Sequence, residues 1–193
     1  MHRPRIYANM ADAELLALSA DGDRCAFDAI VIRYGPYALR VAVRLVSTRA
    51  VAEDLVQEAM VRAWSQAKRF DPGRASFNTW LYRIVVNLCT DERRRTQPEP
   101  MSDKFDGPDQ DALPDETMEA AERHARLATA LRALPARQQA AMTLVYDEGM
   151  SGAEAGRVLG VSAKAVERLL ARARGSLRGR LLVAHGGMET GPC

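Results

Sequence analysis

The sequence has few of the residues on which metal and redox sites depend. It contains three cysteines and three histidines among 193 residues. Cys25, Cys89 and Cys193 are far apart, and no CxxC pair or histidine at ligand spacing accompanies them. This spacing excludes the common zinc motifs and predicts reduced thiols. We therefore expect no metal site.

Motifs of enzyme chemistry are missing as well. His2, His124 and His185 are widely separated, and neither a phosphate-binding P-loop nor a nucleophile motif occurs. An enzyme is thus the least favoured of the function classes, and we expect no catalytic residue and no cofactor.

The chain also lacks long apolar runs and strand patterns. There is no run of about 18 apolar residues and no apolar leader segment, so we expect a cytoplasmic protein without membrane insertion. Aromatic residues make up only 6% of the chain. Alternating β-branched residues do not stand out, whereas Ala, Leu, Val and Arg are abundant. This composition predicts an all-α fold.

Charge is plentiful but unevenly placed. The formal net charge is only +2, yet residues 62–95 and 123–182 are basic, and residues 96–122 hold nine acidic residues against one basic. Basic blocks within folded segments suggest contact with a polyanion, although charge that serves solubility alone is the alternative. The pattern predicts two small helical domains at 11–95 and 119–182, a flexible acidic, Pro-containing linker at 96–118, and a disordered tail at 183–193.

The first half of the chain has helical periodicity. A break at Asp21-Gly22-Asp23 separates two helices, and Gly35-Pro36 either interrupts the second or begins a further element. A helix that starts near Ala50 has a buried stripe and a second, mostly acidic face. The residues of that face recur at i, i+3, i+4 and i+7. The face either binds a basic partner or is an ordinary solvated face. It consists of Asp54, Gln57, Glu58 and Val61.

The segment Phe70–Arg95 combines an aromatic cluster, a turn and a basic end in one helical register. Ser76 is a plausible N-cap. The apolar stripe is Phe77, Trp80, Leu81, Ile84, Val85 and Leu88, and the opposite polar face is Thr79, Arg83, Asn87, Thr90 and Arg94. Such a helix suits unstacked bases and a phosphate backbone. The alternative is a solvated helix whose arginines favour its C-terminal dipole.

The second basic block contains a helix-turn-helix pattern. Ser151 and Glu154 form a capping box, Gly160 supplies the turn and Ser162 caps a second helix. The exposed face of this second helix is suited to phosphates and base edges in the major groove, and a protein-binding hairpin is the alternative. That face carries Lys164, Glu167, Arg168, Ala171, Arg172 and Arg174.

Taken together, these segments resemble an RNA polymerase sigma factor of the sigma-70 family, extracytoplasmic-function (group IV) type, over roughly residues 20–182. Residues 52–58 resemble region 2.2, which binds the β′ clamp helices of the polymerase. The segment Phe70–Arg95 resembles regions 2.3 and 2.4, which melt and read the minus-10 promoter element. Residues 134–181 resemble region 4, which reads the minus-35 element.

The resemblance implies three sets of site residues. The core-polymerase contacts are Asp54, Gln57, Glu58 and Val61; the minus-10 contacts are Ser76, Phe77, Asn78, Trp80, Arg83, Asn87, Arg93, Arg94 and Arg95; the minus-35 contacts are Ser162, Lys164, Glu167, Arg168, Ala171, Arg172 and Arg174. It also implies three partners: core RNA polymerase through its β′ clamp and β subunits, promoter DNA, and an anti-sigma protein that controls the factor in a stress response.

The recognition helix departs from the family pattern, in which Gly-Thr-Val is followed by Lys or Arg and Ser. Here the matching residues are Lys164-Ala165-Val166-Glu167-Arg168. Glu167 either accepts a hydrogen bond from a cytosine amino group or repels phosphates, so the minus-35 sequence stays open. From the residues alone, a stand-alone helix-turn-helix repressor or activator that binds duplex operators as a dimer is the competing function.

Overall fold

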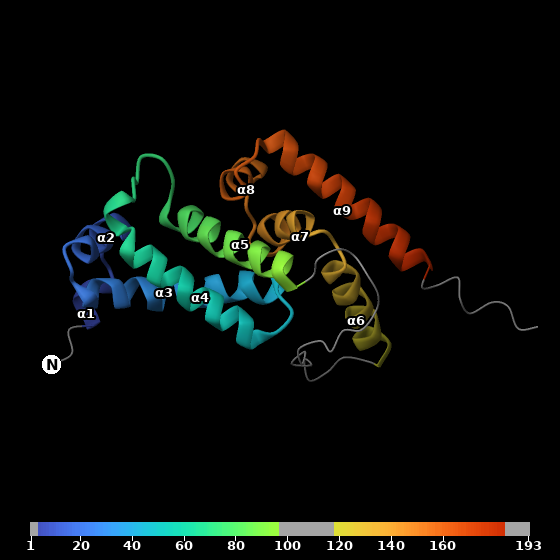
Figure 1. Ribbon diagram of the computed structural model, residues 1–193, viewed down its shortest axis with the longest axis horizontal. Helices are drawn as coiled ribbons and strands as arrows, with labels where there is room; N and C mark the ends of the chain where they lie inside the picture. Colours follow the sequence, from blue (N-terminus) through green and yellow to red (C-terminus); the bar gives the residue numbers. More distant parts are fainter. Residues whose placement is uncertain (1–3, 97–117, 184–193) are drawn as a thin grey trace, which may run out of the picture.

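The computed structural model describes residues 4–96 and 118–183, and all regular structure in these two ranges is helical (Figure 1). The all-α prediction is therefore confirmed for the described residues. The predicted linker, 96–118, lies outside them except for its two end residues, which belong to helices, and the predicted tail, 183–193, lies outside them except for Val183. No helix of the described ranges combines the length and apolar character needed to cross a bilayer.

The first lobe, residues 4–96, begins with the short helix α1. Its elements are α1 (Pro4–Tyr7), α2 (Asp12–Ala20), α3 (Arg24–Leu45), α4 (Arg49–Ser65), the 3-10 turn η1 (Ala67–Arg69) and α5 (Phe77–Thr96). The Asp23 carboxylate accepts hydrogen bonds from the backbone of Cys25 and Ala26 and so starts α3. Thr48 starts α4 by accepting from the amide of Val51. Both caps satisfy amides that have no partner within the helix.

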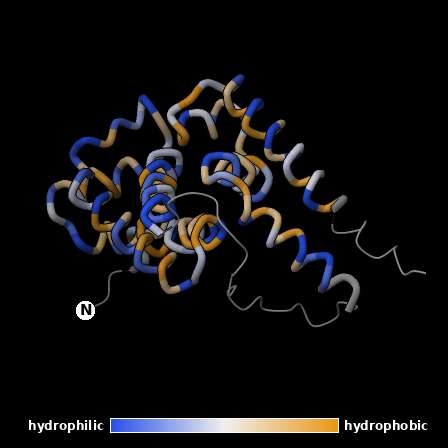
Figure 2. Tube along the Cα trace, turned by 45° about the vertical axis from the view of Figure 1, so that its right-hand side comes forward, coloured by the Kyte–Doolittle hydropathy of each residue, from blue (hydrophilic) through white to orange (hydrophobic). Residues whose placement is uncertain are grey.

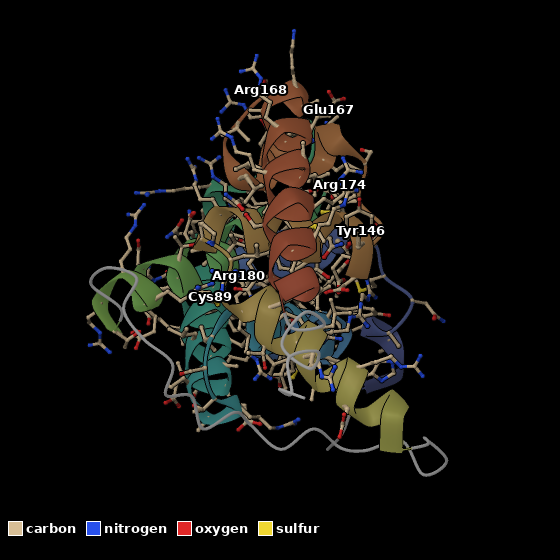
Figure 3. The ribbon with its side chains drawn as sticks, turned by 90° about the vertical axis from the view of Figure 1, so that its right-hand side faces the viewer. Cys89, Tyr146, Glu167, Arg168, Arg174 and Arg180 are labelled. Atoms are coloured by element: carbon tan, nitrogen blue, oxygen red, sulfur yellow. The ribbon has the colours of Figure 1, made fainter. Side chains whose placement is uncertain are left out.

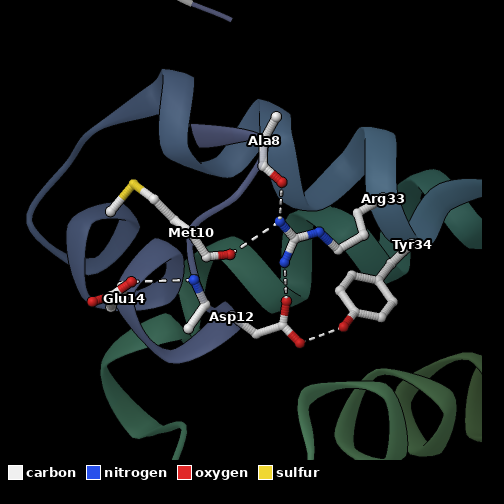
Figure 4. A network of polar contacts seen from close by, with 7 residues as sticks. Ala8, Met10, Asp12, Glu14, Arg33 and Tyr34 are labelled. Atoms are coloured by element: carbon white, nitrogen blue, oxygen red, sulfur yellow. Dashed lines mark hydrogen bonds and ion pairs between the residues drawn. The ribbon is translucent and has the colours of Figure 1, made fainter. Parts of the chain in front are cut away.

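An arginine ties the N-terminal segment to α3 (Figure 4). The Arg33 guanidinium donates to the carbonyl oxygens of Ala8 at 2.9 Å and Met10 at 3.1 Å, and to the Asp12 carboxylate at 2.5 Å. The hydroxyl of the adjacent Tyr34 donates to the same carboxylate. This network fixes the entry into α2 against the middle of α3.

The second lobe, residues 118–183, ends in a helix-turn-helix. Its elements are α6 (Met118–Arg132), α7 (Ala136–Met142), the π-helical turn η2 (Thr143–Asp147), α8 (Gly152–Leu159) and α9 (Ala163–Val183). The predicted capping box is present, since Ser151 Oγ accepts from the Glu154 amide and the Glu154 carboxylate accepts from the Ser151 amide. Gly160 ends α8 with a φ of +66°, in the left-handed region that glycine adopts without strain.

Helix α5 is buried on two sides. The predicted stripe packs into the first lobe, with Phe77 and Leu81 at 1% and 0% exposure. A second stripe containing Thr79, Tyr82 and Val86 is also buried, although the sequence pattern placed Thr79 on a polar, solvated face. The reason is tertiary: α5 packs against α8 and α7 as well as against α3 and α4 (Figure 1). The second lobe covers what would otherwise be the outer side of α5.

The two lobes therefore share one apolar core. A single cluster of buried residues runs from Leu15 in α2 to Leu170 in α9 and includes Ala140, Leu144 and Val158. A smaller cluster joins α6 to the C-terminal half of α9 and consists of Ala130, Leu134, Ala173 and Leu177. Figure 2 shows hydrophobic and hydrophilic residues alternating along the helices, as expected for helices with one face buried.

Candidate polymerase- and DNA-binding surfaces

The acidic face predicted on α4 lies on the surface of the first lobe. Asp54, Gln57 and Glu58 are exposed, and 62% of Val61 is accessible to solvent. Glu58 forms an ion pair with Arg62 one turn later at 2.5 Å. Val61 is the apolar member of this otherwise polar face.

An apolar groove runs beside this face, between α3 and α4. It has a volume of about 510 Å³, and its lining includes Phe27 and Trp64, whose rings meet edge to face with centroids 4.9 Å apart. Val61 and Gln57 line it from α4, and Val31, which is 36% exposed, lines it from α3. The sequence pattern identified the α4 side only. Nothing in a linear pattern shows which turn of α3 lies opposite.

The loop before α5 is held by short polar contacts. Asp71 Oδ1 accepts from the Gly73 amide at 2.9 Å and forms a tight turn. Ser76 Oγ accepts from the Thr79 amide at 3.3 Å and lies 2.9 Å from Thr79 Oγ1. Ser76 thus caps α5, as its position in the sequence predicted.

An aromatic cluster forms where this loop meets α5. Phe70, Phe77 and Trp80 lie with ring centroids between 5.5 and 5.9 Å apart. Phe77 has 1% of its surface exposed and also packs against Tyr34. It is therefore a support behind Trp80 and Phe70, both of which are half-buried and keep part of each ring at the surface.

The polar residues predicted on α5 separate into two groups. Arg83, Asn87, Arg94 and Arg95 are exposed, whereas Asn78 is half-buried. The buried amide oxygen of Asn78 has no hydrogen-bonding partner among the described residues.

Arg93 differs from the two arginines that follow it. Its guanidinium donates to the side-chain oxygen of Gln139 and to the carbonyl oxygens of Arg132 and Leu134, the last two at 3.2 and 3.1 Å. Burial lowers the pKa of Arg93 below its ordinary value. In this conformation Arg93 joins the two lobes instead of facing solvent.

The recognition helix presents the residues that its register predicted. Ser162 Oγ accepts from the Ala165 amide and caps α9. Val166, Leu170 and Ala173 face the core. The side chains at the N-terminal end of α9, including Glu167 and Arg168, project away from the rest of the molecule (Figure 3). All seven residues predicted for this surface are exposed: Ser162, Lys164, Glu167, Arg168, Ala171, Arg172 and Arg174.

The loop before α5 and the helix-turn-helix face each other across a cleft of about 680 Å³. Arg69, Arg74 and Arg83 line it from the first lobe, and Arg157 and Ser162 line it from the second. Composition alone could not identify Arg69, Arg74 and Arg157 as part of this surface, because their proximity depends on how the two lobes pack. Across the cleft, the basic surface around α5 lies next to the helix-turn-helix.

These features define a helical DNA-binding protein with two lobes, one carrying an aromatic and basic helix and the other a helix-turn-helix. Comparison with known families agrees with this class. Residues 30–99 match the model of sigma-70 region 2, and residues 124–177 match the model of sigma-70 region 4. The chain belongs to the sigma-70 family, in its extracytoplasmic-function (ECF) group.

Individual relatives support this membership. The chain is 38% identical over 187 residues to the ECF RNA polymerase sigma factor SigM of Mycobacterium tuberculosis, an alignment that covers 94% of this chain and 88% of SigM. It is 33% identical to the sigma factor CnrH of Cupriavidus metallidurans over 86% of this chain and 92% of CnrH. The family assignment makes this chain a transcription initiation factor.

Solved structures agree with the fold. CnrH in complex with the cytosolic domain of CnrY superimposes with a TM-score of 0.66 and 32% identity, covering 91% of this chain and 99% of CnrH. The sigma factor RpoE of Bartonella quintana, solved with the anti-sigma factor NepR, gives a TM-score of 0.63 at 24% identity over 81% of this chain and 97% of RpoE. The latter likeness concerns the fold alone.

Proposed function

We propose that this chain directs core RNA polymerase to specific promoters by melting the minus-10 element with residues 11–95 and reading the minus-35 element with residues 119–182. The observation that carries the proposal is the presence of two separate basic surfaces, around α5 and on α9, in a chain whose α4 presents a third, acidic surface. Three surfaces are what a factor needs to join an enzyme to two DNA elements.

In this proposal the α4 face binds the β′ clamp. Asp54 and Glu58 supply negative charge for a basic partner, and Val61 with the neighbouring groove supplies an apolar contact. Charged rims guide association, whereas buried apolar contacts contribute most of the affinity.

The minus-10 contact combines stacking with hydrogen bonding. Trp80 and Phe70 offer partly exposed rings, and stacking of a base on such a ring contributes about 1–3 kcal/mol. Asn78 is half-buried in the first turn of α5, and its buried amide oxygen, which has no hydrogen-bonding partner among the described residues, would accept from a flipped base only after the side chain turns outward. Extrusion of a base costs a few kcal/mol, so both contributions are required to offset it. The exposed residues Arg83, Asn87, Arg94 and Arg95 follow the backbone.

The minus-35 contact uses α9 in the major groove. Arg168, Arg172 and Arg174 are exposed donors for phosphates or for guanine edges, and Ser162 and Lys164 lie at the N-terminal end of the helix, where phosphates bind. Glu167 is the one acidic residue of this face and is suited to a cytosine amino group.

The regulation we propose follows the relatives. The CnrH and RpoE structures contain partner proteins, and that of RpoE is named an anti-sigma factor. An anti-sigma protein that holds this factor in the cytoplasm until a stress signal arrives would act on the same surfaces.

A pull-down with core polymerase tests the proposal. The double substitution Asp54→Arg with Gln57→Ala is expected to reduce core binding at least tenfold, because it reverses one charge and removes one polar contact on the α4 face. Glu122→Arg is the matched control, since Glu122 is an exposed acidic residue on α6 whose ion pair with Arg126 lies within the same helix. Undiminished core binding by the double variant would show that α4 is not the polymerase-binding surface.

A further inference from the structure

The cleft between the loop before α5 and the helix-turn-helix has the size of a small-molecule site. Its volume is about 680 Å³, and such sites measure about 300–1,000 Å³. The first lobe lines it from Arg69 to Arg83, and the second lobe lines it around the turn from α8 to α9. Helix α8 packs against α5 here (Figure 1). A ligand in the cleft would therefore touch both lobes.

Positive charge dominates the lining of this cleft. The charged side chains are four arginines and one carboxylate: Arg69, Arg74, Arg83, Arg157 and Asp71. The carboxylate is already engaged, because it accepts from the Gly73 amide at 2.9 Å and lies 3.6 Å from Arg74 Nε. The other three arginines have no ion-pair partner among the described residues. Unpaired guanidinium groups around one cavity attract an anion of several charges, and their planar forks suit phosphate.

The wall formed by the first lobe is aromatic as well as basic. Phe70 and Trp80 line the cleft with ring centroids 5.5 Å apart, and both rings are half-buried. The buried ring of Phe77 supports them at 5.9 and 5.7 Å. Because this packing restricts the two rings before any ligand arrives, stacking on them costs little side-chain entropy. Any nucleic-acid base can stack on such a ring, since every base has a π face.

The wall formed by the second lobe contains the start of α9. Ser162 lines the cleft and caps the helix by accepting from the Ala165 amide. The two preceding amides, of Ala163 and Lys164, have no acceptor among the described residues. Free amides at the first turn and the helix dipole both favour an anion. Arg157 lines the same wall, so a phosphate there would meet a guanidinium and a helix end together.

A nucleotide with more than one phosphate is the ligand class that suits both walls. Its base matches the aromatic wall and its phosphates match the arginines and the start of α9. Four guanidinium groups and one carboxylate give the lining a formal charge of +3, which favours a di- or triphosphate over a monophosphate. A neutral aromatic ligand would leave the arginines without a partner, and an inorganic phosphate would leave the rings uncovered.

We propose that the cleft binds a nucleoside di- or triphosphate, with its base stacked on Trp80 and Phe70 and its phosphates held by Arg69, Arg157 and the first amides of α9. Binding is a property of the chain alone. The inference rests on the proposed function in one respect: Trp80 and Arg83 are also the proposed contacts of the minus-10 strand, so the nucleotide and the strand would exclude each other.

Fluorescence of Trp80 tests for the stacked base. The chain has two tryptophans, and Trp64→Phe leaves Trp80 as the only indole while it keeps an aromatic ring at position 64. Titration of this full-length protein with ATP should quench the emission saturably. Inorganic triphosphate, which has the charge without the base, should reverse the quench only at concentrations about tenfold higher. Adenosine should cause no saturable quench. Absence of a saturable quench by ATP, or displacement by triphosphate at equal concentration, would overturn the inference.

A matched pair of arginine substitutions tests the position of the phosphates. In the same background, Arg157→Ala should weaken ATP binding about tenfold, because it removes charge-assisted bonds to phosphate. Arg178→Ala removes an exposed arginine of the same lobe that does not line the cleft. It should change the affinity less than about twofold, since solvent screens distant surface charges. Equal losses in two variants that unfold cooperatively, or an unchanged affinity in Arg157→Ala, would show general polyanion attraction and overturn the site.

A competition measurement separates this inference from the proposed function. The unsubstituted protein is titrated into a fluorescein-labelled, single-stranded oligonucleotide of minus-10 length, with and without saturating ATP. We expect ATP to weaken oligonucleotide binding severalfold, because both ligands use Trp80. An unchanged oligonucleotide affinity would overturn the shared use of this ring. If the oligonucleotide does not bind at all while ATP quenches Trp80 as expected, the proposed function fails and the nucleotide site is supported.

Discussion

Arg93 and Leu134 are joined by a 3.1 Å hydrogen bond from the guanidinium to the backbone carbonyl oxygen, which links the last turn of α5 to the turn between α6 and α7. The neighbouring Arg94 has 73% of its side chain exposed, and its ion pair with Asp91 lies within α5. Two adjacent arginines of one predicted DNA-binding segment thus differ in their surroundings.

This difference predicts different effects on stability. Arg93→Ala should lower the free energy of unfolding by about 1–3 kcal/mol, because it leaves buried acceptors without a donor. Arg94→Ala should change it by less than about 0.5 kcal/mol, as is usual for exposed sites. Urea denaturation measures both. Equal losses in the two variants would contradict the interlobe role of Arg93.

The helix-turn-helix depends on a close approach at Gly156. A Cβ at this position would lie 2.7 Å from the carbonyl oxygen of Val161, a backbone atom that cannot move away without opening the turn. Gly156→Ala should therefore destabilise the protein by about 1–3 kcal/mol and displace α9 from its DNA-binding position.

Gly179 provides the control for this substitution. A Cβ there meets nothing within 4 Å, and the residue lies inside α9. Gly179→Ala should raise stability by up to about 1 kcal/mol, because alanine favours helix more than glycine does. Thermal unfolding of both variants checks the pair, and a Gly156→Ala protein as stable as wild type would refute the steric account.

Glu167 allows a test of how α9 reads DNA. If it accepts from a cytosine amino group, Glu167→Ala should relax the preference at one base pair of the minus-35 element by about 1–3 kcal/mol. Binding to a library of minus-35 sequences measures this. Uniformly tighter binding to every sequence would instead mean that Glu167 merely repels phosphates.

The two described cysteines should differ in reactivity. Cys25 is exposed, whereas burial raises the pKa of Cys89 to about 12 from 9.0. A thiol reagent at pH 8 is expected to label Cys25 rapidly and Cys89 only on unfolding, as measured in a Cys193→Ser background.

The same shift predicts a dependence of stability on pH. Because the folded pKa of Cys89 is above the unfolded one, the contribution of this thiol is fully present below pH 9 and is lost between pH 9 and about 12, where the unfolded thiol ionises first. Cys89→Ala should remove this part of the alkaline loss. An unchanged alkaline profile in that variant would contradict the assignment.

Local patterns were sufficient for the surfaces that depend on one helix. The register of α9 placed Lys164 and Arg172 outside and Val166 inside, and the structure agrees. The α4 face and the capping box at Ser151 followed from the same kind of argument. In each case neighbours in the sequence determine which side of the helix faces water.

Patterns failed where distant segments decide the outcome. Thr79 looked solvated because its cover comes from α8, more than seventy positions away in the sequence. Pro36 does not end α3, which continues to Leu45. Pro36 and Ile32 are both exposed, so water can satisfy the carbonyl that the proline ring leaves without a donor. Neither the cover over Thr79 nor the exposure around Pro36 can be predicted from the residues next to it in the sequence.

The double burial of α5 has a practical meaning for anyone who divides this protein into halves. Residues 4–96 made alone would present Tyr82 to water and would leave the guanidinium of Arg93 without its acceptors in the second lobe. In such a fragment, the side of α5 that the second lobe covers in the full chain would be exposed to solvent. Self-association of the fragment and its affinity for nucleic acids would then result from this newly exposed surface. Measurements of the factor's own binding therefore require the undivided chain.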